Sequence, residues 1–328
     1  MNELALAAFA ASNDMHAADR EARSRRFARF ESSFDADAYL RVLGERGLRW
    51  LARSDGAFPE RLGAIHDPPP GLFFRGYAGA ELLSRPAVAM VGARSCTDYG
   101  AHVARELARG IAAAGVVVVS GLARGIDGWA HRGALEAGGD TAAVLGCGID
   151  RDYPRAHAQL AAQIAATGVI VSEYPPGVAP APWRFPARNR IVAGLTLGTI
   201  VVEARERSGA LITADFALEE GREIFAVPGE ITSGLSRGTN ALLRTGAVPV
   251  TCAEDVLEAL GIDPAAKPEP EPPPPGAPRT VLAAIDGGAR TADEITRATG
   301  LAADEVAAAL VELELSALVS AAAGVYRR

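Results

Sequence analysis

Glycine and arginine occur together in several short segments that directly follow apolar runs of this chain. A glycine after a strand lets the backbone turn tightly and point its N–H groups at an anion. The planar guanidinium of arginine matches the oxygens of a phosphate. Because such segments recur, we predict that they converge on one phosphate-binding site. The candidate residues are Gly92, Ala93, Arg94, Ser95, Ser120, Gly121, Ala123, Arg124, Gly146, Gly148, Arg155, Arg188, Asn189, Arg190, Ser208 and Gly209.

Aromatic side chains accompany these arginines and indicate which kind of phosphate the site would bind. Tyr153 stands two residues before Arg155, and Tyr174 follows another apolar run. Unpaired bases stack on aromatic rings while arginines neutralise the phosphates, so we expect Tyr153 and Tyr174 to stack on the bases of a single strand. Trp183 and Phe185 come shortly before a further group of arginines. Either role is open to them, and packing in the core is the favoured one.

Signatures of nucleotide-binding and hydrolytic enzymes are missing. No Gly-x-Gly-x-x-Gly fingerprint follows the first strand, a P-loop is excluded because Lys267 is the only lysine, and no Gly-x-Ser-x-Gly or His-Glu-x-x-His motif occurs. Asp127, Glu173 and Glu203 could act as general acids or bases, but we favour helix caps and arginine partners. His131 is interpreted as a structural hydrogen-bonding residue. We therefore predict no catalysis, no cofactor and no metal.

The apolar runs are the elements that must position the candidate residues. They lie at residues 87–91, 116–120, 141–145, 169–172, 199–203, 223–227 and 247–251. Continuous apolar strands are buried on both faces, and strands separated by helices form parallel βαβ units. The predicted fold class is α/β: an extended Rossmann-like parallel sheet with helices on both faces. Ligands of such sheets bind outside the carboxyl ends of the strands, where the strand order switches.

The chain divides into four segments. Residues 1–60 are predicted to form a small helical region, whose arginines between Arg20 and Arg29 are interpreted as a solvated helix face. The Rossmann-like domain spans residues 61–262. Residues 263–279, of which eight are proline, form an extended linker. Residues 280–328 are predicted to form helices near 280–285, 291–299 and 302–315 and then a hairpin, an order that resembles a winged helix.

Net charge and composition limit the class of protein. The chain carries a net charge of −7, with 49% hydrophobic residues. A nucleic-acid site must therefore be built locally from arginine and not from a diffuse basic surface. Residues 4–11 are apolar, but they lack a basic leader and are too short to span a bilayer. The three cysteines have no disulfide or metal spacing. We expect a cytoplasmic protein that makes no membrane contact.

Eight stretches together resemble the DNA-processing protein A (DprA/Smf) family. They occur in the family's order, over about residues 58–262. They are Val-Gly-Ala-Arg-Ser at 91–95, Ser-Gly-Leu-Ala-Arg-Gly-Ile-Asp at 120–127, Asp-Tyr-Pro-Arg at 152–155, Ser-Glu-Tyr-Pro-Pro-Gly at 172–177, Phe-Pro-Ala-Arg-Asn-Arg-Ile at 185–191, Ser-Gly-Ala-Leu-Ile-Thr at 208–213, Ala-Val-Pro-Gly at 226–229 and Gly-Thr-Asn-Ala-Leu-Leu at 238–243.

This resemblance implies an extended Rossmann domain that binds single-stranded DNA and loads the RecA recombinase during natural transformation, without enzymatic activity. It implies that Arg94 and Arg155 contact the DNA. It also implies a homodimer, whose interface we place around residues 241–244 and 256–260.

The chain departs from the family pattern in three places. His157 replaces the usual asparagine after Tyr-Pro-x-x, and the N-terminal region matches poorly. Residues 302–315, the predicted recognition helix, contain four acids and no basic residue. We expect this domain to contact protein, because phosphates would repel it.

Two other functions remain open. A nucleotide or phosphoribosyl hydrolase of the lysine-decarboxylase-like type would need a Pro-Gly-Gly-x-Gly-Thr loop, from which Pro228-Gly229-Glu230 departs. A recombinase scaffold with only incidental DNA contact is the other alternative.

Overall fold

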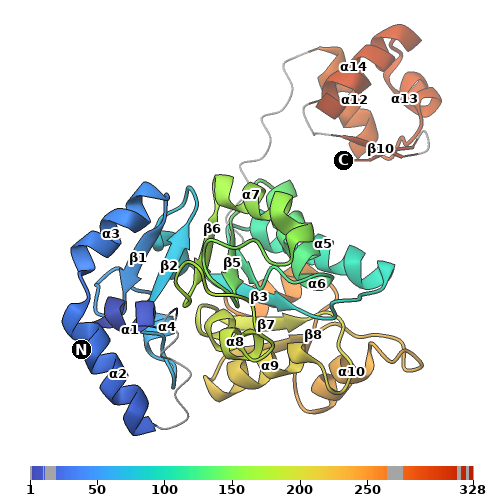
Figure 1. Cartoon of the computed structure of the whole chain (residues 1–328). Helices are drawn as coiled ribbons and strands as arrows, with labels where there is room; N and C mark the ends of the chain where they lie inside the picture. Colours follow the sequence, from blue (N-terminus) through green and yellow to red (C-terminus); the bar gives the residue numbers. More distant parts are fainter. Residues whose placement is uncertain are drawn as a thin grey trace. The chain divides into compact units, whose positions relative to one another are not determined.

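The computed structural model describes residues 2–9, 11, 20–263, 276–315, 319–322 and 325–327. Two compact units make up the chain, Met1–Ala265 and Ala266–Arg328 (Figure 1). No helix among the described residues is long and apolar enough to cross a membrane.

A nine-stranded sheet forms the centre of the first unit. In spatial order its strands are β1 (Arg49–Ala52), β2 (Gly71–Arg75), β6 (Val169–Ser172), β5 (Thr141–Leu145), β4 (Val117–Ser120), β3 (Ala87–Val91), β7 (Gly198–Val201), β8 (Glu223–Ala226) and β9 (Val248–Pro249). From β6 to β9 every pair is parallel. The chain adds strands to one side of β3 and then returns to its other side with β7, so the order switches between these two strands.

The parallel strands confirm the predicted fold class, but the N-terminal edge of the sheet differs from the prediction. β2 pairs antiparallel with β6, and β1 pairs antiparallel with β2. β1 lies within residues 1–60, which were predicted to be helical. Its burial comes from contacts distant in sequence, such as Trp50 against Phe73 at 4.5 Å between ring centroids. Tertiary pairing of this kind outweighs local propensity in a four-residue strand.

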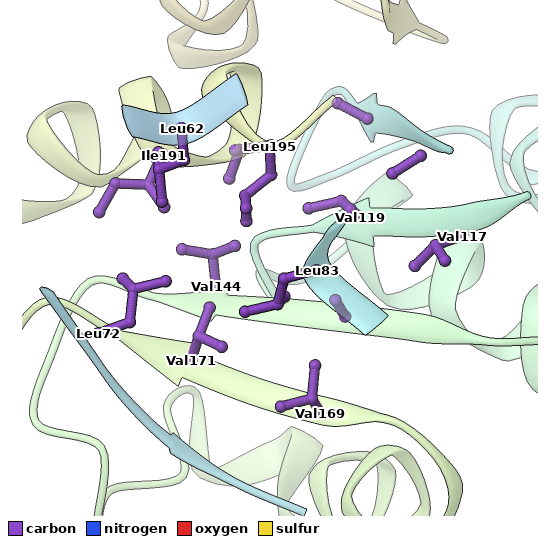
Figure 2. Close-up of a cluster of buried hydrophobic side chains, with 14 of the residues drawn as sticks. Leu62, Leu72, Leu83, Val117, Val119, Val144, Val169, Val171, Ile191 and Leu195 are labelled. Atoms are coloured by element: carbon purple, nitrogen blue, oxygen red, sulfur yellow. The ribbon is translucent and has the colours of Figure 1, made fainter. Parts of the chain in front are cut away.

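Helices cover both faces of the sheet. One face packs against α4 (Glu60–Gly63), α8 (Arg184–Gly194) and α9 (Gly209–Glu219). The opposite face packs against α5 (Asp98–Ala113), α6 (Ile126–Glu136), α7 (Ala158–Thr167) and α11 (Ala253–Ala259). Successive side chains of a strand point to opposite faces of the sheet. The strands therefore contribute to the hydrophobic cores on both faces. Figure 2 shows the first core, which contains Leu62, Leu72, Leu83, Val117, Val119, Val144, Val169, Val171, Ile191 and Leu195.

The N-terminal helices belong to the same unit. They are α1 (Glu3–Phe9), α2 (Arg20–Ser33) and α3 (Ala36–Glu45). A chain of ring contacts joins them, from Phe9 through Phe30 and Phe34 to Tyr39. Leu4 and Leu43 add to the core beneath β5 and β6. The arginines of α2 at positions 23, 25, 26 and 29 are exposed, as expected for a solvated face.

The predicted dimer-forming segments lie on α10 (Arg237–Arg244) and α11. Arg244 is exposed, and residues 241–243 are partly buried. Val256 and Leu257 are instead packed in the core beneath the sheet. These two side chains are therefore not available to a partner, whereas Glu258 and Ala259 of the same predicted segment are exposed.

The second unit contains the three helices and the hairpin expected from the sequence. They are α12 (Ala277–Asp286), α13 (Ala292–Thr299) and α14 (Ala303–Leu315), with β10 (Ser320–Ala322) antiparallel to β11 (Val325–Arg327). A capping box between Thr291 and Glu294 begins α13, and Gly300 in the left-handed region ends it. The predicted linker spans residues 263–279, of which 264–275 lie outside the described residues.

Candidate functional site

A cleft of about 550 Å³ opens at the carboxyl ends of β3, β4 and β7, where the strand order switches. This is the location predicted for a ligand of an open parallel sheet. Eight predicted residues line it: Gly92, Arg94, Ala123, Tyr153, Arg188, Asn189, Ser208 and Gly209. Asp127 and Phe185 line it as well, although the sequence had assigned neither to the site.

Close contacts between loops fix the shape of the cleft. The N–H of Ile126 donates to the carbonyl of Ala93 at 3.2 Å, and the N–H of Ala93 donates to the carbonyl of Glu203 at 2.7 Å. Gly125, which directly precedes Ile126, has a φ of +75. A Cβ at this position would lie 2.1 Å from the carbonyl oxygen of Ala93. Only glycine tolerates both the positive φ and the close approach of the Ala93 carbonyl, which explains why this loop needs glycine here.

Arginine and two aromatic rings form one wall. The guanidinium carbon of Arg94 lies 5.3 Å from the centroid of the Phe185 ring. Phe185 in turn stacks on Tyr153, with 5.4 Å between centroids and 27° between planes. Arg94 is exposed, and Tyr153 is 42% exposed. A cation and a flat apolar surface thus face the same opening.

The floor of the cleft contains a buried carboxylate opposite a buried arginine. Oδ2 of Asp127 accepts the N–H groups of Gly121 at 3.1 Å and Ala123 at 3.3 Å. Burial raises the pKa of Asp127, against the opposing effect of Arg188. Arg188 is 4% exposed, donates to the carbonyl of Val144, and has its pKa lowered by burial.

Asp127 changes how the loop can bind an anion. Gly121 and Ala123 were predicted to offer their N–H groups to phosphate, but the carboxylate of Asp127 already occupies those donors. The prediction for Gly121 and Ala123 was therefore wrong. The cause is local, because an acid in the first turn of a helix readily accepts the N–H groups of the preceding glycine-rich turn. The positive groups that remain in this cleft are the guanidiniums of Arg94 and Arg188.

Four other predicted phosphate-binding residues have structural roles. The hydroxyl of Ser120 donates to the carbonyl of Met90 at 2.6 Å, and the N–H of Gly148 donates to the carbonyl of Val178 at 2.9 Å. Gly146 lets the Phe185 ring approach, since a Cβ there would lie 2.8 Å from that ring. Arg190 binds Glu173 with both terminal nitrogens, at 2.6 and 3.1 Å, and Asp67 through Nε at 2.9 Å. These groups are engaged inside the protein.

Tyr174 and Trp183 depart from their predicted roles. Tyr174 is only 6% exposed, meets Trp183 edge-on at 6.4 Å, and lies 5.2 Å from the guanidinium carbon of Arg184. Burial raises its pKa to about 12. Its ring has no open face for a base. Trp183, for which core packing had been favoured, is 53% exposed.

The remaining candidates lie outside the cleft lining. Ser95, Arg124 and Arg155 are exposed. Arg155 begins a short 3-10 helix, η3 (Arg155–His157), directly after the loop that carries Tyr153. Among the described residues no cluster of three or more histidines, cysteines or carboxylates is placed to hold a metal ion.

Comparison with known proteins identifies the family. Residues 49–261 match the family model described as DNA recombination-mediator protein A. The chain belongs to this family. Residues 265–324 match the DprA winged helix domain, as the second unit's fold indicates.

Relatives in this family cover most of the chain. It is 47% identical to the DNA processing protein DprA of Streptococcus pneumoniae over 203 residues, 62% of this chain and 71% of that protein. It is 41% identical to the protein Smf of Escherichia coli over 311 residues, 87% of this chain and 80% of that protein. The resemblance found in the sequence is thus confirmed.

Two solved structures of the family are similar. The X-ray structure of DprA from S. pneumoniae aligns with a TM-score of 0.66 and 41% identity, covering 74% of this chain and 83% of the other. A DprA structure from Helicobacter pylori, described by its single-stranded DNA binding mode, aligns with a TM-score of 0.57 and 33% identity, covering 62% and 92%.

Proposed function

We propose that the cleft binds single-stranded DNA and that the chain is a non-catalytic mediator, which protects incoming strands and delivers them to the RecA recombinase in the cytoplasm. The observation that carries this proposal is the wall of Arg94, Phe185 and Tyr153 at the switch point of the sheet. An exposed guanidinium beside stacked rings suits a flexible strand, because it pairs with a phosphate while the rings accept bases.

Support also comes from the relatives. The H. pylori structure, which aligns over 62% of this chain, is described by its binding of single-stranded DNA. Arg155 is exposed and follows Tyr153, which lines the cleft, by two residues, so it can add a second cation close to the opening.

The hydrolase alternative finds little support in the loop that it requires. The side chain of Asn240 bonds both the N–H of Gly229, at 3.2 Å, and its carbonyl, at 3.0 Å. That segment is therefore tied to α10. A test with nucleoside monophosphates separates the two functions, since a DNA mediator would show no turnover.

The proposal is tested by measuring the affinity for single- and double-stranded oligonucleotides across a salt series. We expect a preference for single strands. For Arg94→Ala/Arg155→Ala we expect affinity to fall at least about tenfold, because one charged hydrogen bond contributes about 1.5–3 kcal/mol. The slope of log affinity against log salt should become shallower by about 0.7 for each phosphate that the variant no longer neutralises.

The matched control is Arg109→Ala. Arg109 is also exposed, but lies near the end of α5 beside Glu106 at 2.6 Å, away from the cleft. The Arg109→Ala variant should bind single-stranded DNA with the affinity and salt dependence of the wild type. Equal affinities of the double variant and the wild type would contradict the assignment of the site, and absence of binding by the wild type would contradict the function itself.

RecA delivery needs its own test. If the chain is a mediator, it should speed the assembly of RecA filaments on single strands, and Arg94→Ala/Arg155→Ala should lose this effect. A scaffold with incidental DNA contact would instead retain it. We further propose that the chain acts as a homodimer through residues 241–244, so Leu243→Glu should shift the sedimentation of the protein toward the monomer.

A further inference from the structure

A second hollow of about 660 Å³ lies between α6 and α7, outside the cleft. Leu135 and Leu160 contribute apolar surface to its lining. Gln159, Gln163 and Thr167 supply amides and a hydroxyl from α7, and Arg132 supplies a cation from α6. We call this hollow the α6–α7 groove.

Arg132 reaches toward the start of α6, the end of that helix nearer to the cleft. A Cβ on Gly128 would lie 3.0 Å from Nη1 of Arg132. The guanidinium therefore reaches back along α6 to its first turn. It also lies over the ring of Trp129, with 5.0 Å to the centroid. A cation and an aromatic ring thus stand together at this point, as they do in the cleft.

The other side of the groove begins three residues along the chain from the cleft, because Tyr153 lines the cleft and Ala156 lines the groove. Ala156 lines the groove and directly follows Arg155, the exposed arginine proposed to contact DNA. Both α6 and α7 begin at the edge of the sheet where the cleft opens and run away from it. A DNA strand that passes Arg155 would therefore meet the groove at Ala156.

The chemistry of the groove suits a nucleic-acid strand without sequence preference. Glutamine amides both donate and accept, so Gln159 and Gln163 can bond any base edge or a phosphate. The acid of the groove, Glu136, is held by Arg105 with 2.5 Å between Nε and Oε2. This ion pair reduces the repulsion that Glu136 would exert on a phosphate.

We propose that single-stranded DNA leaving the cleft continues into the α6–α7 groove, guided by Arg132 and bonded by Gln159 and Gln163. The inference rests on the proposed function of the cleft and adds a second subsite to it. The bound length of DNA is then set by cleft and groove together. A short oligonucleotide fills the cleft alone, whereas a longer one engages both.

The test compares two oligothymidylates, of about 4 and about 15 nucleotides, spanning the usual range of single-strand site sizes. Gln159→Glu/Gln163→Glu places two negative charges in the groove without changing side-chain size. We expect the affinity for the long oligonucleotide to fall about tenfold or more, while that for the short one stays within about twofold. Arg132→Gln should lower only the long oligonucleotide's affinity and make its salt slope shallower.

The matched control is Ala158→Glu/Ala162→Glu. It adds the same two charges at the same spacing on the same helix, at exposed positions that do not line the groove. Its affinity for the long oligonucleotide should stay close to that of the wild type. An equal fall in affinity for the control and the test variants would contradict the proposed subsite, because long-range repulsion between the added carboxylates and the DNA phosphates would then explain both results.

Two further outcomes separate this inference from the function of the cleft. If the wild type binds both oligonucleotides and the groove variants leave both affinities unchanged, the groove is not a subsite and the cleft assignment survives. If the wild type binds neither, the proposed function fails, and the subsite fails with it. Thermal unfolding of each variant verifies that the exposed substitutions on α7 leave the fold intact.

Discussion

The guanidinium of Arg94 lies over the ring of Phe185, 5.3 Å from its centroid. Phe185 stacks on its other neighbour, Tyr153, so one cation and two rings form a continuous surface. Phe185 comes from α8 and Tyr153 from the loop after β5, and Arg94 from the loop after β3. This surface exists only because the parallel fold brings two loops and the first turn of α8 to one edge of the sheet.

Tyr153→Ala should weaken binding of single-stranded DNA by about 1–3 kcal/mol, because one stacked base contributes that much. Tyr153→Phe should keep most of the affinity, since the ring remains. The measurement is fluorescence anisotropy at fixed salt, with Tyr77→Ala as the control because Tyr77 is 84% exposed on a different loop. Equal affinities for Tyr153→Ala and the control would show that no base stacks here.

Arg188→Met should lower the free energy of unfolding by about 1.5–3 kcal/mol, because it removes the charged hydrogen bond to the buried carbonyl of Val144. It also removes the positive charge that opposes the effect of burial on the pKa of Asp127. Asp127→Asn/Arg188→Met should be less destabilised than the sum of the two single variants. Urea unfolding of all four proteins measures this coupling. Additive effects would mean that the two side chains do not stabilise each other.

His131 should make stability depend on pH. Burial, with repulsion from His157, lowers its pKa from 6.5 to about 3, so the folded protein holds it neutral. Between these two values the unfolded chain binds a proton that the folded one does not. The free energy of unfolding must therefore fall as the pH falls below 6.5, with a slope approaching about 1.4 kcal/mol per pH unit.

The pH effect is isolated by His131→Leu, measured by urea unfolding between pH 5 and 6.5. The variant should show a flatter dependence than the wild type, whatever its absolute stability. His102→Leu, on the exposed side of α5, should keep the wild-type slope. An unchanged slope in His131→Leu would mean that His131 is protonated in the folded protein.

Removing residues 279–328 should leave the affinity for single-stranded DNA within about twofold. Exposed Asp304 and Glu305 begin α14, which contains no arginine or lysine, so phosphates would be repelled there. The truncated and full chains are compared by the same salt series. A clear fall in affinity with unchanged self-association would show that the second unit contacts DNA after all.

Sequence reasoning worked best where local pattern and tertiary role coincide. The apolar runs of β3 to β7 have no polar alternation, so their burial between two helical layers followed from the sequence pattern. The position of Arg94 followed as well, because residues just beyond a buried parallel strand must emerge at the edge of the sheet. Eight of the fifteen residues that line the cleft were predicted, although Arg188 and Asn189 among them lie on α8 and not just beyond a strand.

What the sequence could not predict depends on partners distant along the chain. Arg190 and Arg188 stand two residues apart, yet one pairs with Glu173 and Asp67 while the other faces the cleft. Nothing local distinguishes them. For Asp127 the sequence favoured a capping role, and only the fold shows that its carboxylate takes the N–H groups of Gly121 and Ala123, which had been expected to bind phosphate.

Both edges of the sheet are poor templates for a foreign strand. β9 consists of Val248 and Pro249, and proline has no N–H to offer a neighbour. At the other edge, β1 is only four residues long, and Arg49 reaches from it to the carbonyls of Gly76 and Ala78, at 2.8 Å each. Ordered pairing of one molecule's sheet with the next is hindered at both ends. Molecules of this protein can therefore lie close together with little tendency to join strand to strand into fibres.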